Sequence, residues 1–197
     1  HYVSGAGSGE VGGPGHSLSG RVVRVELRMQ PTQILMDEHR VIERVLGALE
    51  AAAARMSAGA AVRAEFFLQA ADFIAAFADG CHHRKEEGVL FPALEAAGIP
   101  RDGGPVGVML AEHEEGRRIT RGLRAAAERM QAGDGDAATA ARYKALEYVA
   151  LLRQHIMKED NILFPMADGA IQGREQAAVV AEFGRLQREE TADGVQV

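Results

Sequence analysis

Apolar residues recur at helical spacing along the chain from Pro31 onward. A first helix is predicted from Pro31 to about "MSAGA" (56–60), with an apolar face of Ile34, Leu35, Ile42, Val45, Leu46 and Leu49. A second begins at about Ala61 and carries Phe66, Ala70, Phe73, Ile74 and Phe77. It stops at "AAGIPRDGGP" (96–105), because glycine and proline disfavour the helix interior.

Three more helices follow in the pattern. The third is predicted from about Val106 to Met130, and the fourth from Asp136, a plausible N-cap, to about Ala167. The segment "REQAAVVAEFGRLQREE" (174–190) predicts a short fifth helix, and the tail "TADGVQV" is expected to fray. No strand pattern competes. The predicted fold is therefore all-α, an up-down-up-down antiparallel four-helix bundle with a short extra C-terminal helix.

The same pattern divides the chain into three parts. Residues 1–30 are rich in Gly and Ser and predict a flexible N-terminal extension. Residues 31–168 form the predicted bundle, and residues 169–197 the C-terminal short helix and tail. We also hypothesise that "MQPTQILMDEHR" (29–40) marks the natural beginning, and that the upstream residues are an extension or a cloning remnant.

Composition narrows the function classes. A length of 197 residues suits one domain, and 47% hydrophobic residues without Trp suit a helical protein. The net charge of −6, with no basic stripe, argues against nucleic acid. The apolar runs are too short or too interrupted to cross a bilayer, so no membrane partner is expected. A single cysteine, Cys81, excludes an internal disulfide, and we expect a soluble cytoplasmic protein.

Two matching segments carry the candidate chemistry, "CHHRKEEGVLFP" (81–92) and "QHIMKEDNILFP" (154–165). Residues four apart share a helix face, so His82 lies with Glu86 and His155 with Glu159. Each pair could bind one metal ion, and a carboxylate can bridge two cations, which favours a di-metal site. The line through His83 contains acidic residues, so His83 is expected at the edge of the site or in solvent.

Two further histidines stand alone on apolar faces, His39 and His113. A lone buried histidine is more often a satisfied core residue than a ligand. All four long helices, however, then carry one histidine on the apolar face, and this coincidence favours the metal site. The repeated Leu-Phe-Pro tails are interpreted as core packing with a helix-bending proline, and Cys81 as a small buried apolar residue.

These motifs resemble the hemerythrin-like, HHE cation-binding family. The family pattern is His, His-x-x-x-Glu, His, His-x-x-x-Glu/Asp on four successive helices, supplied here by "DEHRVI", "HHRKEEGVLFP", "AEHEEGR" and "HIMKEDNILFP" over roughly residues 31–168. The resemblance implies two iron ions in a non-haem di-iron centre that binds O2, peroxide or NO, in sensing or detoxification. It implies these metal ligands: His39, His82, Glu86, His113, His155 and Glu159.

The chain departs from oxygen-carrying hemerythrins at two positions. They have a second histidine four residues after the one on the third helix, where this chain has Arg117. Their last carboxylate lies five residues after the fourth-helix histidine, which would select Asp160, although the internal repeat favours Glu159. Candidates for the missing ligand are His83, Glu43 and Tyr148, with solvent as an equal alternative. An open position argues against a pure O2 carrier and leaves room for redox chemistry.

Three function classes stay open at this stage. The first is a module that captures O2 or senses oxygen, iron or NO. The second is a di-iron enzyme with catalase-like or NO-reducing activity, and the third is a metal-free helical interaction domain. Manganese and zinc also suit a site of histidine and carboxylate. The sequence does not define an oligomeric state.

Overall fold

The computed structural model describes residues 30–192, with side chains as far as Glu190. Nearly all of this range is helical and contains no strand, which confirms the prediction of an all-α fold. The predicted flexible extension lies outside the described residues except for Gln30, and so does the predicted frayed tail after Ala192. Within 30–192, no helix combines the length and apolar character that crossing a membrane requires.

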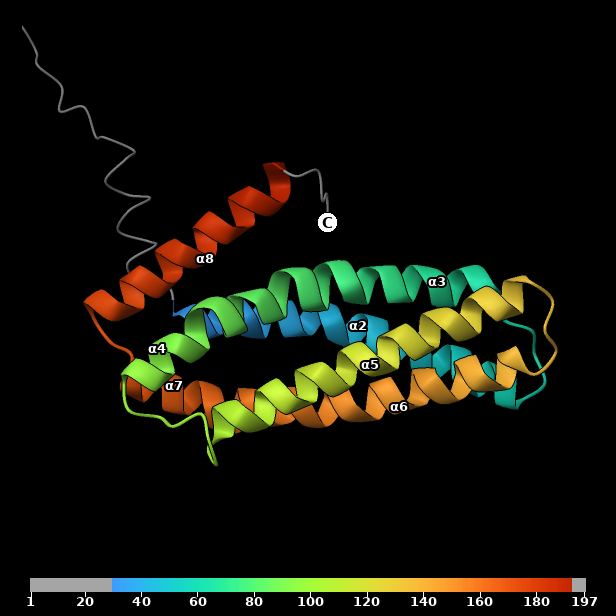
Figure 1. Cartoon of the computed structure of the whole chain (residues 1–197), viewed down its shortest axis with the longest axis horizontal. Coiled ribbons are helices and arrows are strands. Elements are labelled where there is room, and N and C mark those ends of the chain that lie inside the picture. Colours follow the sequence, from blue (N-terminus) through green and yellow to red (C-terminus); the bar gives the residue numbers. More distant parts are fainter. Residues whose placement is uncertain (1–29, 193–197) are drawn as a thin grey trace, which may run out of the picture.

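Four helical arms run side by side along the long axis (Figure 1). The first arm is α2 (Pro31–Ser57) and the third is α5 (Pro105–Gln131). The second arm consists of α3 (Ala64–Phe73), η1 (Ile74–His83), η2 (Glu86–Leu90) and α4 (Phe91–Ala96). The fourth consists of α6 (Ala137–Lys158), η3 (Glu159–Leu163) and α7 (Phe164–Ala170). Last comes α8 (Arg174–Ala192), which includes the first two residues of the predicted tail.

Ion pairs show how the second and third arms face each other. Arg124 on α5 pairs with Asp72 at 2.5 Å, and Arg117 pairs with Asp79 at 2.7 Å. From the first pair to the second, the residue number falls on α5 and rises on the second arm, so these two arms are antiparallel.

The first and fourth arms are antiparallel by the same reasoning. Arg40, early in α2, pairs with Asp160, whereas Ser57 at the end of α2 accepts a hydrogen bond from Arg142 at 3.1 Å. Asp136 stands before α6 as predicted, but its side chain makes no cap hydrogen bond. Its backbone N–H instead donates to the Asp134 carboxylate at 3.0 Å.

The sequence pattern predicted continuous α-helices for the second and fourth arms, but the structure interrupts both. Both contain π-helical turns at the repeated motifs, in η1 and η2 on the second arm and in η3 on the fourth. A π-helix closes its hydrogen bonds over five residues instead of four, so each residue turns the chain through a smaller angle. Adjacent side chains in η1 therefore point in more similar directions than in an α-helix.

The repeated Leu-Phe-Pro tails pack in the core, as predicted. Leu90, Phe91, Leu163 and Phe164 are at most 1% exposed and belong to one apolar cluster with residues of α8. The prolines that follow, at positions 92 and 165, stand in the first turns of α4 and α7, where a missing N–H costs little. The two tails thus close the core at one end of the histidine motifs.

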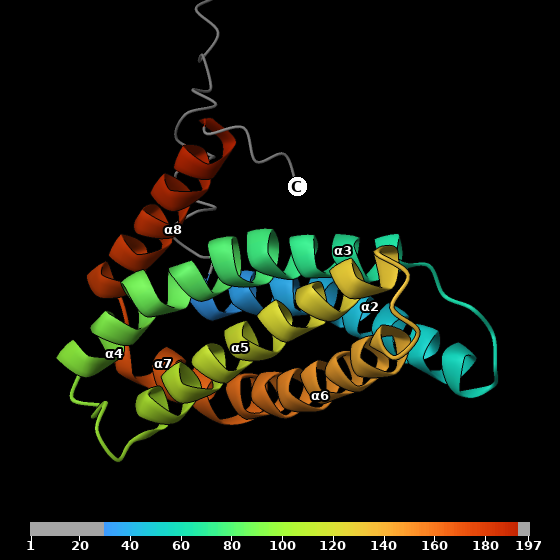
Figure 2. The ribbon, with the colours of Figure 1, turned by 45° about the vertical axis from the view of Figure 1, so that its right-hand side comes forward.

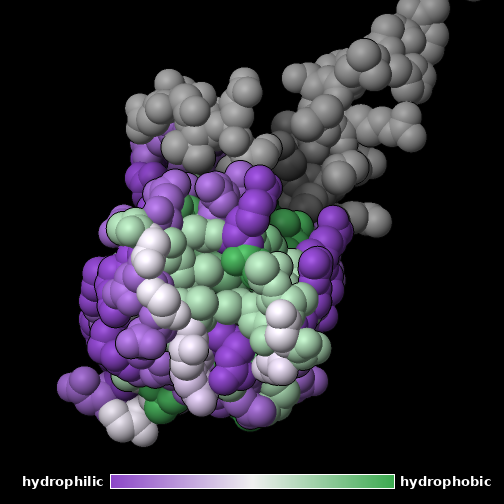
Figure 3. Space-filling view, turned by 90° about the vertical axis from the view of Figure 1, so that its right-hand side faces the viewer, coloured by the Kyte–Doolittle hydropathy of each residue, from purple (hydrophilic) through white to green (hydrophobic). Residues whose placement is uncertain are grey.

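The two ends of the molecule differ. Two views show α8 leaving at an angle from the end where α4 and α7 lie (Figure 1, Figure 2). The opposite end shows apolar side chains at the surface (Figure 3). There Met56, Ala60, Ala61 and Val62 border a shallow hollow between the first and second arms and α6.

Candidate metal centre

All five histidines of the described range converge on one point between the four arms. His39 comes from α2, His113 from α5 and His155 from α6, whereas the second arm contributes two. Two glutamates join them. The cluster, which we call the His/Glu cluster, consists of His39, His82, His83, Glu86, His113, His155 and Glu159, each at most 4% exposed.

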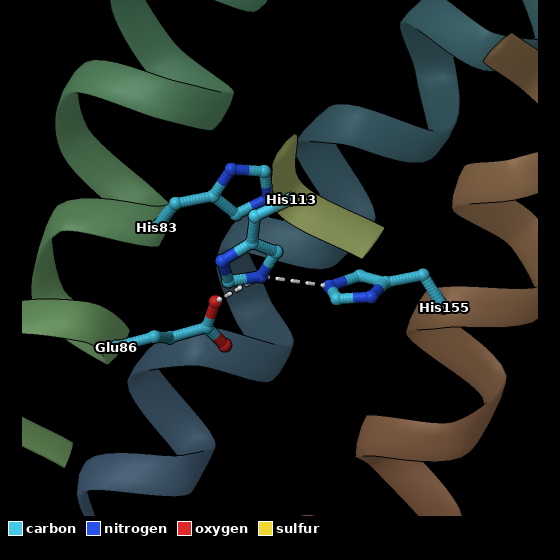
Figure 4. A group of neighbouring side chains, drawn as sticks. All are labelled: His83, Glu86, His113 and His155. Carbon is cyan, nitrogen blue, oxygen red and sulfur yellow. Dashed lines mark hydrogen bonds and ion pairs between the residues drawn. The ribbon is translucent and has the colours of Figure 1, made fainter. Parts of the chain in front are cut away.

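The His/Glu cluster consists of two overlapping groups that could each hold a metal ion. The ligand atoms within each group lie within 4.8 Å of one another. Figure 4 shows the first group, in which side chains of the second arm, α5 and α6 point toward a shared centre. Glu86 belongs to both groups. The members are His83, Glu86, His113 and His155 in the first group, and His39, His82, Glu86 and Glu159 in the second.

Each glutamate of the cluster lies between histidines of two different arms. One oxygen of Glu159, Oε2, is 3.1 Å from His39 Nε2 and 3.2 Å from His155 Nε2. The two oxygens of Glu86 divide in the same way, with Oε1 3.4 Å from His82 Nε2 and Oε2 3.4 Å from His113 Nε2. Both carboxylates are therefore placed to bridge two cations.

Every imidazole of the cluster contacts a carboxylate through its outer nitrogen, Nδ1. Because an ionised carboxylate only accepts hydrogen bonds, each Nδ1–H donates outward and each Nε2 faces into the cluster. This fixes both the tautomer and the orientation of the rings. The Nδ1 to carboxylate distances are 2.7 Å for His39 and Asp160, 3.0 Å for His82 and Glu38, 3.4 Å for His83 and Asp79, 2.7 Å for His113 and Glu87, and 3.0 Å for His155 and Glu112.

A third layer of cations holds these outer carboxylates. Lys85 pairs with Glu38, Arg40 with Asp160, and Lys158 with Glu112. Arg117 serves two carboxylates, donating to Asp79 at 2.7 Å and to Glu87 at 2.6 Å. Each imidazole of the cluster is thus held by a carboxylate that a cation holds in turn; Lys85 is buried, whereas Arg40, Arg117 and Lys158 are partly exposed.

Most inward atoms of the cluster lack hydrogen-bond partners; the exceptions are Nε2 of His113 and Nε2 of His155, which lie 3.1 Å apart and form one hydrogen bond. The atoms without partners include Nε2 of His39, His82 and His83 and both carboxylate oxygens of Glu86 and Glu159, all of them buried. Their contacts of 3.1 to 3.4 Å do not have hydrogen-bond geometry. Buried polar atoms normally find a partner, and an unpaired carboxylate is especially costly. Buried lone pairs that converge without hydrogen-bond partners suit cations at the centre.

A comparison with known proteins decides the family. The sequence model of the family described as Hemerythrin HHE cation binding domain matches residues 30–167, which includes nearly all of the four arms and the whole His/Glu cluster. The chain belongs to this hemerythrin family. The resemblance seen in the two repeated motifs is thereby confirmed.

Two relatives extend the comparison. This hemerythrin-family chain is 28% identical to the uncharacterized protein Rv1995 of Mycobacterium tuberculosis over 158 residues, 80% of this chain and 61% of the relative. It is 34% identical to the iron-sulfur cluster repair protein YtfE of Edwardsiella ictaluri over 92 residues, 46% of this chain and 42% of that protein. The matches thus span about three fifths or less of the relatives' lengths. No solved structure gives a significant match.

Burial and neighbouring charges set the protonation of the metal-free cluster. Burial, together with the charge of Glu159, holds the pKa of Glu86 well above its usual range. Burial also acts to raise the pKa of Glu159, but His155 and His39 outweigh it and lower that pKa. Burial acts to lower the pKa of His155, but Glu159 and Glu112 outweigh it and raise this pKa to about 9. Some cluster groups therefore carry protons that cations would displace.

His83 was expected at the edge of the site or in solvent, and the structure places it among the cluster residues, away from solvent. Its imidazole is buried and stacks on the ring of His113, with 3.8 Å between the centroids. Burial and the neighbouring His113 lower the pKa of His83 to about 4, so the ring is neutral at pH 7. The π-helical turns of η1 explain the difference, because they bring two adjacent side chains toward the same centre. The acidic neighbours that suggested solvent, Asp79 and Glu87, are the carboxylates behind His83 and His113.

The other candidate ligands from the sequence analysis, Glu43, Asp160 and Tyr148, lie outside the His/Glu cluster. Glu43 is half exposed and pairs with Arg40 at 3.2 Å, away from the cluster. Asp160 stands behind His39, whereas Glu159 faces inward. Tyr148 is buried and lines a cavity next to His83. Cys81 is buried as predicted, with its sulfur 3.2 Å from Lys85 Nζ.

The sequence analysis missed the outer carboxylates. One signal for them exists, because a glutamate directly precedes the cluster histidine on both α2 and α5. Glu38 precedes His39 but contacts His82, and Glu112 precedes His113 but contacts His155. The repeated Glu-His pair could have identified these two.

Proposed function

We propose that the His/Glu cluster holds two iron ions. His83, His113 and His155 would bind the first ion, His39 and His82 the second, with Glu86 and Glu159 shared between them. The observation that supports this most strongly is the set of buried Nε2 and carboxylate atoms that have no hydrogen-bond partner. Imidazole and carboxylate from facing helices are the ligands of di-iron bundle sites, and two carboxylates offset part of the cations' charge.

We also propose a topology and domain bounds for the chain. Residues 31–168 would form the up-down-up-down four-helix bundle, preceded by the 1–30 extension and followed by the 169–197 helix and tail. The antiparallel ion pairs between the arms support this topology. A reducing, cytoplasmic location fits the one cysteine, which is buried and unpaired.

The proposed function is binding of O2 or a related small ligand, peroxide or NO, in oxygen, redox or iron sensing or in detoxification. When bound, the two irons would supply a redox-active centre that takes such a ligand. The chain's own residues keep the imidazoles in place and exclude water. Phe164 stacks on His39 with ring centroids 5.5 Å apart, and Phe91 on His113 at 5.8 Å, so both rings cover the cluster on its closed side.

One argument from the sequence loses its basis. Arg117 replaces a histidine of the oxygen-carrying hemerythrins, which suggested one imidazole too few. The cluster nevertheless contains five imidazoles, because His83 occupies the inner position next to His113. The replacement therefore no longer argues against an O2 carrier. Its guanidinium instead supports two of the outer carboxylates.

Metal analysis of protein purified under iron-replete conditions tests the proposal. Two irons per chain with a near-ultraviolet ligand-to-metal band are expected, and the double variant Glu86→Gln with Glu159→Gln should lose both. Glu43→Gln is the matched control, since Glu43 lies away from the cluster. Absence of iron, with no change in melting temperature on chelation, would support the metal-free interaction domain instead.

Reaction with the small ligands separates binding from turnover. A stable oxygenated spectrum with slow autoxidation supports the binding function. Catalytic O2 evolution from peroxide, or continuous loss of NO, supports the di-iron enzyme. Loading with manganese or zinc in place of iron tests the metal, because the ligand set suits these ions as well.

A further inference from the structure

A cavity of about 160 Å³ lies directly beside the His/Glu cluster, between the second arm, α5 and α6. His83, Tyr148 and Gly116, all buried, form its inner wall. Ala75 and Arg121, both exposed, stand at its mouth. We call it the His83 cavity. It is open to solvent on one side and reaches a cluster imidazole on the other.

The size of the His83 cavity limits its occupant. An apolar cavity of roughly 150 Å³ in another protein binds benzene, so this space suits a six-membered ring or a short branched chain. Ile74, Ala75 and the Tyr148 ring provide apolar surface for such a body. Gly116 at the inner wall has no side chain, and a Cβ there would meet Tyr148 and Leu152 at an ordinary contact distance of 3.7 Å.

Within the described residues, Tyr148 contributes its ring and an unpaired hydroxyl to the cavity wall. Tyr148 is 1% exposed, and its hydroxyl has no hydrogen-bond partner within residues 30–190. Burial, with the nearby charge of Asp79, raises the pKa of Tyr148, so the O–H proton is present at neutral pH.

One positive charge at the mouth lacks a counter-ion. Three arginines of α5 line the cavity, but Arg117 is paired with Asp79, Glu87 and Glu114, and Arg124 with Asp72. Arg121 forms no ion pair with any residue between 30 and 190. A guanidinium offers a planar set of donors that matches a carboxylate.

We propose that the His83 cavity binds a small organic anion, with an apolar body of about the size of benzene inside the cavity and its carboxylate on Arg121. The occupant would lie against the side of the His/Glu cluster that His83 forms and shield His83 from solvent. This site would lie beside the proposed metal centre and does not require the metals to be bound.

Isothermal titration with benzoate as the probe tests the proposal, on the full chain as purified and after metal removal. Benzamide, of the same shape without the charge, is the matched ligand. Benzoate should bind both forms saturably and at least about tenfold more tightly than benzamide, because charge-assisted hydrogen bonds exceed neutral ones. Arg121→Gln should remove this preference. Arg44→Gln is the control, because it makes the same change in net charge at an exposed arginine of α2. It should leave the preference for benzoate intact.

A second pair of variants tests the position of the site. Ala75→Leu places a larger side chain at the mouth and should weaken both ligands, whereas Ala76→Leu changes the exposed neighbour and should not. Equal affinity for the two ligands, or no binding of either, would overturn the proposal. Benzoate binding that survives Arg121→Gln and Ala75→Leu but disappears on metal removal would place the anion on the metals and also refute it.

Discussion

The carboxylate of Glu38 on α2 lies 3.0 Å from Nδ1 of His82 on the neighbouring arm. The same relationship recurs between Glu112 on α5 and His155 on α6, again at 3.0 Å. In both cases a Glu-His pair on one helix contributes its histidine to the His/Glu cluster and its glutamate to a histidine of the next arm. The cluster is therefore oriented by contacts between helices, and its geometry depends on their register.

Glu112→Gln tests the role of these outer carboxylates. The amide keeps the shape but loses the charge that holds the Nδ1–H of His155, so metal affinity should fall by roughly 10- to 100-fold. Competition with a coloured chelator measures this. Glu50→Gln is the control, because Glu50 pairs with Arg153 on the surface, away from the cluster. Unchanged affinity in Glu112→Gln would show that the outer carboxylate does not support the site.

Arg117 should support the cluster through two carboxylates at once. Arg117→Met removes the donor shared by Asp79 and Glu87 and should weaken metal binding by about tenfold. Arg117→Lys keeps the charge but not the fork, so its affinity should fall between those of Arg117→Met and the unaltered chain. An equal loss in both variants would show that the forked geometry is what matters, and no loss in either would contradict the account.

Lys85 is a fully buried cation, and its partner Glu38 is 12% exposed at the side chain. Lys85→Met leaves the carboxylate without its charge partner, so the free energy of unfolding should fall by about 3 kcal/mol. Denaturant unfolding of metal-free protein measures this. Arg153→Met, which breaks an exposed ion pair, should produce no measurable change. If Lys85→Met had the same free energy of unfolding as Arg153→Met, the buried ion pair would not contribute to stability.

Phe164 should contribute both packing and cover. It is fully buried and stacks on His39, so Phe164→Ala should lower the free energy of unfolding by about 3–5 kcal/mol. Met166→Ala, two residues further on and 40% exposed, is the control and should have a small effect. Thermal or denaturant unfolding gives both values. A small effect at Phe164 would contradict its place in the core.

The sequence defined the inward face of the arms well and their outward contacts poorly. His82 and Glu86, like His155 and Glu159, follow from four-residue spacing on an apolar face, and the structure brings them together. His83 could not be placed this way, because that argument assumed α-helical geometry and the second arm has π-helical turns at the motif. The outer carboxylates depend on which helices meet and in what register, which a single helix pattern does not encode.

The central claim is that five imidazoles and two carboxylates from four arms bind two iron ions. A crystal structure of the iron-loaded chain, with anomalous diffraction at the iron edge, tests it most directly. The account predicts two anomalous peaks, one contacted by Nε2 of His83, His113 and His155, the other by Nε2 of His39 and His82, with Glu86 and Glu159 touching both. No peak at the His/Glu cluster, or iron held by other residues, would contradict it.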